Sequence, residues 1–150
     1  MNNLEKLRIE KGISVEELIK VMKIKEDIYY LYVKEDKYMS FLLLKIMATY
    51  YNVSIDYLLG ITNVKKRYKK SIHPINNHII NRFKSIRINN KISSKTLNKI
   101  LNITSYLYYE KNNIKMPYHI LKKLAYLYDV SIDYLLCFTD ECIGNIKIIK

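Results

Sequence analysis

The side chains best suited to holding a metal ion are three histidines and two cysteines, namely His73, His78, His119, Cys137 and Cys142. A structural zinc site needs four such ligands, arranged as closely spaced pairs. The chain has one cysteine pair, and the gaps from it to the histidines are wrong for such a site, so we expect no metal and no other cofactor. In a reducing cytosol we expect both cysteines to be free thiols.

Catalytic and phosphate-loop patterns are also missing. The chain has only three glycines, so it lacks a glycine-rich phosphate loop, and no spacing of Ser, His and Asp indicates a catalytic triad. We therefore expect a protein that is not an enzyme. Neither a membrane-spanning apolar run nor an apolar leader core is present, so we expect a cytoplasmic protein that does not engage a membrane.

The charge is distributed unevenly. The net charge is +12 for 150 residues, but residues 1–64 sum to zero, residues 65–82 to +6 and residues 83–150 to +6. The densest cationic run is KKRYKK, which supplies Lys65, Lys66, Arg67, Lys69 and Lys70. As a DNA-binding arm this run would add affinity without regard to sequence, because neutralised phosphates release counterions. As a solvated charge run it would merely keep a linker extended.

An internal duplication organises the chain. The heptapeptide VSIDYLL occurs at 53–59 and again at 130–136, an offset of 77 residues. Upstream the best offset becomes 79, where LRIEKGISVEEL (7–18) lies over IRINNKISSKTL (86–97). The second copy has therefore lost two residues, which we place between the equivalents of Tyr29 and Tyr32. We predict two related units rather than one large domain.

Both copies are predicted to be helical. Apolar residues recur at spacings of three and four, and Ser14 and Ser54 stand where a helix N-cap is expected. VSIDYLL is thus interpreted as a helix-starting sequence. We expect an all-α fold, with domains at 1–62 and 75–140, a basic linker at 63–74 and a tail at 141–150.

The two copies resemble the Xre or phage-repressor type of helix-turn-helix domain. The likeness is carried by LRIEKGISVEEL and ATYYNVSIDYLLG in the first copy, and it spans 4–60 and 83–136. The resemblance implies two tandem five-helix repressor-like domains, with the third helix of each in a DNA major groove. It further implies that the tandem imitates the usual dimer, with two recognition helices about one DNA turn apart.

The first copy departs from that family at its expected reading surface. The family usually has Gln where Val15 stands, and Lys23 occupies a turn position that favours Gly. Lys25 is a poor N-cap, and Glu26 and Asp27 would repel phosphate. A degenerate reading surface is therefore expected here. The DNA contacts still assigned to this copy are Lys25 and Tyr30.

The second copy matches the family better at the corresponding surface. We expect Ser94 and Lys95 to hold phosphate at the start of the second helix. Thr104 is predicted to be the N-cap of the third helix, with Ser105 and Tyr106 in its first turn and all three near DNA. We expect the two-residue loss to shorten this helix towards its C-terminus.

These features predict a non-catalytic DNA-binding transcriptional regulator, repressor-like, of a bacterium, phage or mobile element. Its expected partner is double-stranded DNA, and a homodimer or another regulator protein are further candidates. The alternative is a protein-interaction module, or an antagonist of another regulator, that uses Glu26, Asp27, Tyr29 and Tyr30 in an exposed aromatic patch with Tyr32. An RNA-binding or antitoxin-like role is a third class that the residues leave open.

Overall fold

The computed structural model describes residues 2–71, 75–112 and 116–142, with side chains described for these ranges except 75–81 and 112. The expected linker residues 72–74 and tail residues 143–150 lie outside the described residues. The described part is all-helical and contains no strand. Its helices are α1 (Leu4–Glu10), α2 (Val15–Met22), α3 (Glu26–Lys34), α4 (Phe41–Tyr51), α5 (Ile55–Leu58), α6 (Ile75–Asn89), α7 (Ser94–Leu101), α8 (Tyr106–Asn112), α9 (Tyr118–Tyr128) and α10 (Ile132–Leu135).

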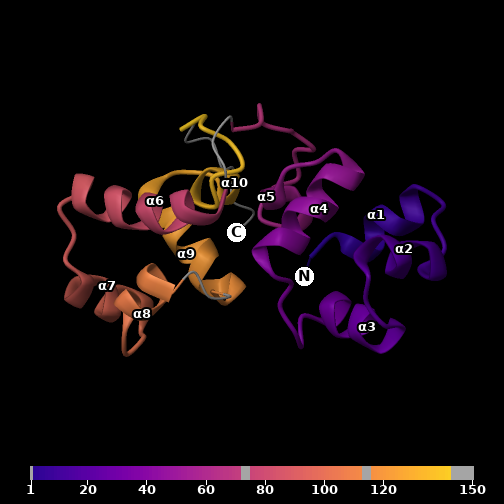
Figure 1. Cartoon of the computed structure of the whole chain (residues 1–150), viewed down its shortest axis with the longest axis horizontal. Helices are drawn as coiled ribbons and strands as arrows, with labels where there is room; N and C mark the ends of the chain where they lie inside the picture. Colours follow the sequence, from indigo (N-terminus) through magenta and orange to yellow (C-terminus); the bar gives the residue numbers. More distant parts are fainter. Residues whose placement is uncertain (1, 72–74, 113–115, 143–150) are drawn as a thin grey trace. The chain divides into compact units, whose positions relative to one another are not determined.

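The chain divides into two compact units, and the division falls inside the basic run. The first unit extends to Arg67 and the second begins at Tyr68. Helices α1 to α5 belong to the first unit and α6 to α10 to the second (Figure 1). Of the expected linker, residues 63–67 belong to the first unit and 68–71 to the second.

Serine caps start the helices where the sequence places them. Ser14 Oγ accepts from the Glu17 amide at 3.1 Å, and Ser54 Oγ accepts from the Tyr57 amide at the same distance. In the second unit Ser131 Oγ accepts from the Tyr134 amide at 3.0 Å. Each such bond satisfies one orphan N–H at a helix start, which stabilises the helix by about 1 kcal/mol. VSIDYLL therefore starts a helix in both copies, as predicted.

Left-handed residues end several helices at repeat-related positions. Lys23 follows α2 with φ of 53° and Asn102 follows α7 with φ of 55°. Asn52 and Asp129 end α4 and α9 in the same conformation. Asn tolerates this conformation because its short polar side chain can bond locally, whereas Lys carries a backbone penalty of about 1–2 kcal/mol. The expected strain at Lys23 is thus present.

Each unit has its own apolar core. In the first unit the fully buried side chains include Leu4, Leu18 and Met47. In the second unit they include Leu97 and Leu124. The α2 and α7 faces that contribute to these cores are the apolar stripes that the three- and four-residue spacing predicted. Among the described helices, none combines the length and apolar character needed to cross a bilayer.

Candidate nucleic-acid interface

The turn between α7 and α8 is the clearest candidate surface in the second unit. Ser93 Oγ caps α7 by accepting from the Thr96 amide at 3.0 Å, and Asn102 ends that helix. Lys95 is exposed on the first turn of α7, beside the half-buried Ser94. This segment therefore presents a cation and a small polar side chain at a well-formed helix start, which are groups that suit a phosphate.

The structure corrects the predicted start of the third helix. Helix α8 begins at Tyr106, so Thr104 and Ser105 lie in the preceding turn, where both are exposed. Thr104 is not its N-cap. Tyr106 is 0% exposed and packs in the core, which removes it from the expected DNA contacts. Its ring is buried because Tyr106 is the first residue of α8, where this helix packs against the rest of the second unit.

The surface around this turn is cationic. Within residues 82–111 the exposed charged side chains are all lysines, namely Lys84, Lys91, Lys95, Lys99 and Lys111. The single carboxylate in this stretch is that of Glu110, which is 3% exposed. A stretch that exposes only cations attracts polyanions and supplies sequence-independent affinity for nucleic acid.

An internal ion pair neutralises that one carboxylate. Arg87 Nε and Nη2 donate to the two Glu110 oxygens at 2.8 and 2.9 Å, which joins α6 to α8. The hydrogen bond to Glu110 raises the pKa of Arg87. The residue pattern did not single out this pair. The one sequence feature that pointed to it is the repetition of Arg8 as Arg87 at the 79-residue offset. Arg8 also donates to a carboxylate, that of Glu5.

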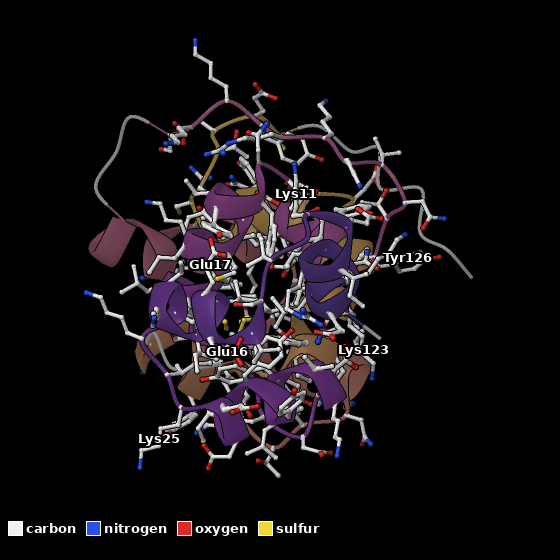
Figure 2. All side chains as sticks on the ribbon, turned by 90° about the vertical axis from the view of Figure 1, so that its right-hand side faces the viewer. Lys11, Glu16, Glu17, Lys25, Lys123 and Tyr126 are labelled. Atoms are coloured by element: carbon white, nitrogen blue, oxygen red, sulfur yellow. The ribbon has the colours of Figure 1, made fainter. Side chains whose placement is uncertain are left out.

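The corresponding helix starts of the first unit carry carboxylates. Glu16 and Glu17 are exposed in the first turn of α2, and Glu26 and Asp27 are exposed in the first turn of α3. Lys25 precedes α3 and is exposed, and its side chain makes no cap bond. Figure 2 looks onto this unit and labels Glu16, Glu17 and Lys25. Lys20 and Lys23 are exposed as well, so the segment from α2 to the first turn of α3 exposes four carboxylates and three lysines. The degenerate reading surface stays a prediction.

The expected aromatic patch of the first unit is wrong. Tyr29 is 0% and Tyr32 is 6% exposed, and only Tyr30, at 42%, is open to solvent. The Tyr29 hydroxyl donates to the Glu5 carboxylate, which joins α3 to α1, and its burial raises the pKa of Tyr29. Helical spacing put Tyr29 and Tyr32 on one face, and that face is the one that packs inward.

Burial also relocates the two-residue loss. Tyr29 of α3 and Tyr106 of α8 are both 0% exposed and stand 77 residues apart. Tyr108, which the 79-residue offset pairs with Tyr29, is 51% exposed, so the burial pattern favours a loss that precedes the buried tyrosine. The end of α8 adjoins residues 113–115, which lie outside the described residues, so the shortening of this helix towards its C-terminus stays a prediction.

The first part of the basic run is attached to the first unit. Lys65 Nζ lies 2.5 Å from Glu10 Oε2. Arg67 donates to the Thr49 carbonyl at 3.3 Å and to Asn52 Oδ1 at 3.1 Å, at the end of α4. These two cations therefore have partners within the first unit, and their expected contact with the DNA backbone stays a prediction. Lys66 is exposed.

The later part of the run belongs to the second unit. The Lys69 amide donates to Glu141 Oε1 at 3.3 Å, and Ser71 Oγ donates to Asp140 Oδ2 at 2.8 Å. Both contacts use the backbone or a serine, so they leave the Lys69 ammonium unused. Lys69 and Lys70 have exposed side chains with no ion pair in the described part of the chain. They are the cations of the run best placed to meet an external phosphate.

Comparison with known proteins gives no family. No family model, no curated protein and no solved structure matches the chain. The described residues also contain no group of three or more His, Cys, Asp or Glu side chains placed to hold a metal ion. The resemblance to Xre-type domains therefore rests on the residues quoted from this sequence alone.

Proposed function

We propose that this protein is a non-catalytic, repressor-like regulator of transcription that binds double-stranded DNA through its second unit. The supporting observation is the surface of residues 82–111, which exposes five lysines while its one carboxylate is buried against Arg87. Under this proposal the two units are tandem helix-turn-helix domains, in which α7 and α8 are the second and third helices of the reading unit.

The proposed contact is mainly to the DNA backbone. Lys95 and Lys99 lie on α7, and the Thr104 and Ser105 hydroxyls lie in the turn that follows. Lysines and hydroxyls are the usual partners of phosphate oxygens, which fix the register of a protein on the duplex. Neutralising each phosphate releases counterions, so affinity falls with salt by about 0.9 in the log–log slope for each contact.

The duplication supplies matched positions for testing this assignment. Lys95 of α7 corresponds to Glu16 of α2, and Lys99 corresponds to Lys20, both at the 79-residue offset. The second unit therefore carries a cation where the first carries a carboxylate, at the first turn of the same helix. This difference in sign is our reason for assigning the contact to the second unit alone.

The test measures the binding of a labelled mixed-sequence DNA duplex to the full chain as a function of salt. Lys95→Glu, which installs the residue of the first copy, should weaken binding by more than tenfold and reduce the salt slope by about 1. Lys20→Ala in the first unit is the control and should change neither quantity. Loss of affinity from Lys20→Ala that equals the loss from Lys95→Glu would contradict the assignment to the second unit. A duplex RNA of equal length serves as competitor, and preferential displacement by it would favour the RNA-binding class.

A second candidate function is protein interaction through the first unit. The observation that favours it is the set of four exposed carboxylates at the starts of α2 and α3, which would suit a cationic partner and repel DNA. The variant Glu26→Lys/Asp27→Lys distinguishes the two. If the first unit lies against DNA, this change should strengthen DNA binding several-fold. If it serves another partner, DNA binding should stay unchanged.

A further inference from the structure

One side of α4 carries apolar side chains that remain open to solvent. Leu42 is 65% exposed, Ile46 is 39% exposed and Tyr50 is 38% exposed. These three residues are four positions apart, so they follow one another along one side of the helix and form the α4 surface stripe. The other side of α4 packs into the first unit through residues such as Leu44 and Met47. A helix that is apolar on both sides is normally covered on both, which indicates a contact with another surface.

The second unit lacks this stripe on the equivalent helix. At the 77-residue offset, His119 and Lys123 of α9 stand in place of Leu42 and Ile46, and both are exposed. The third position is taken by Leu127, which is half-buried. The fold itself does not require apolar residues at these positions, because α9 packs into its own unit without them. The stripe is therefore a property of the first unit.

The charge of the two units indicates which surface covers the stripe. Residues 1–64 have a net charge of zero, whereas residues 83–150 sum to +6. Two first units can therefore approach each other without net repulsion, which two second units cannot. Lys45 is the one charged residue of α4, so a surface that covers the stripe meets few charges. A neutral and apolar surface of this kind is present on a second copy of the first unit.

The spacing of the stripe suits packing against itself. Ile46 is its middle residue, four positions from Leu42 and four from Tyr50. In an antiparallel pair of α4 helices, a two-fold axis beside Ile46 sets the two copies of this residue against each other. The same axis sets each Leu42 against the Tyr50 of the other copy, so that a smaller side chain faces a larger one.

We propose that the α4 surface stripe is an interface with a second copy of this chain, in which two α4 helices pack antiparallel about a two-fold axis. Of α4 and α9, only α4 carries the complete stripe, so the contact closes on itself and gives a dimer. A complete stripe on α9 as well would give each chain two association surfaces and open-ended assembly, which His119 and Lys123 prevent. One helix face is a small interface, so the dimer is weak. It forms whether or not the second unit binds DNA.

The experiment measures the mass of the full chain by sedimentation equilibrium in the absence of DNA. Concentrations run from about 1 µM to about 1 mM, which brackets the dissociation constants of small interfaces. The unaltered chain should pass from monomer to dimer in this range. Ile46→Lys installs the residue of α9 and should raise the dissociation constant by more than about tenfold, because its ammonium group would be buried without a partner.

Two further variants make the result specific to the stripe. Tyr126→Lys is the control, because Tyr126 is 72% exposed on α9 and the change adds the same charge outside the stripe. It should dimerise like the unaltered chain. Leu42→His, which installs the α9 residue at the most exposed position of the stripe, should weaken the dimer as Ile46→Lys does. Urea unfolding at low protein concentration shows whether each variant is folded.

The reverse exchange tests why assembly stops at the dimer. His119→Leu/Lys123→Ile completes the stripe on α9 and should produce species larger than a dimer at the upper concentrations. The absence of larger species would contradict the role of these two residues in closing the assembly.

The outcomes also separate this interface from the proposed function. A chain that stays monomeric over the whole range, or a dimer that Ile46→Lys leaves intact, overturns the interface and assigns the stripe to a different occupant. Neither result bears on binding of duplex DNA by the second unit, which the salt series with Lys95→Glu tests separately.

Discussion

Removing the Glu110 carboxylate should destabilise the second unit strongly. Its side chain is 4% exposed and that of its partner Arg87 is 15% exposed, so the pair is largely withdrawn from water. Glu110→Ala leaves the guanidinium with one remaining acceptor, the Ile92 carbonyl at 3.4 Å. Breaking a buried pair in this way typically costs 3–5 kcal/mol. Because Arg87 keeps some access to solvent, we expect the lower end, about 3 kcal/mol. Glu110→Gln retains one acceptor oxygen and should cost about half as much.

The measurement is urea unfolding of the full chain followed by circular dichroism. With a urea dependence of about 1 kcal/mol/M for a small unit, Glu110→Ala should lower the midpoint of one transition by about 3 M. Hydrogen exchange should locate the loss of protection in α6 and α8. The matched control is Glu10→Ala, which breaks the exposed pair with Lys65 and should cost less than about 1 kcal/mol.

Similar shifts for Glu110→Ala and Glu10→Ala would refute a desolvated Arg87–Glu110 pair. It is also refuted if exchange protection is lost in the first unit rather than between α6 and α8. Either result would mean that the carboxylate and the guanidinium are hydrated in solution, since only a desolvated pair carries the large cost of an unpaired charge.

Four further outcomes follow from individual side chains. Tyr128→Phe should stabilise the second unit by about 1 kcal/mol, because the Tyr128 hydroxyl is buried with no acceptor in the described part of the chain. Tyr29→Phe should instead destabilise the first unit by about 1.5 kcal/mol, because it removes the hydroxyl that donates to Glu5. Burial raises the pKa of Tyr128 to about 12, so stability that is complete below pH 10 should fall as the pH rises from 10 through 12, and Tyr128→Phe should reduce that fall in an alkaline unfolding titration. The pKa of Glu5 lies below 4.5 because Arg8 of the same helix donates to its carboxylate. The stabilisation by Glu5 is therefore complete above pH 4.5 and should be lost as the pH falls below that value. Glu5→Gln should abolish this loss in acid unfolding curves. Lys69→Ala/Lys70→Ala should reduce the salt slope of DNA binding by up to about 1.8, and an unchanged slope would show that these cations do not reach phosphate.

Local features of the fold could be predicted well from the residues. Ser14 and Ser54 begin helices because a short hydroxyl side chain reaches the N–H three residues on, a relation within one turn of chain. Lys23 takes the left-handed conformation because the helix ends there, and the sequence spacing gave that position too. The duplication can likewise be recognised from the amino-acid sequence alone, and the division of the chain into two units agrees with it.

The errors concern which face of a helix is buried and which distant residue completes a contact. From the sequence we expected Tyr29 and Tyr106 to contact a partner. Their packing against other helices shows that both are core residues. The partners of Lys65 and Arg67 could not be predicted, because Glu10, Thr49 and Asn52 lie far away in sequence. No spacing rule links such residues.

The sequence by itself determined the repeat and the sign of the charge along the chain. It also determined the helical class and the helix starts at Ser14 and Ser54, since these depend on neighbours within one or two turns. The tertiary structure decided that Glu110 is withdrawn against Arg87, that Asn98 accepts from the first amide of α8, and that Thr104 and Ser105 are exposed. The physical reason is that desolvation and hydrogen-bond partnership depend on which helices come together. Sequence separation alone carries no such information.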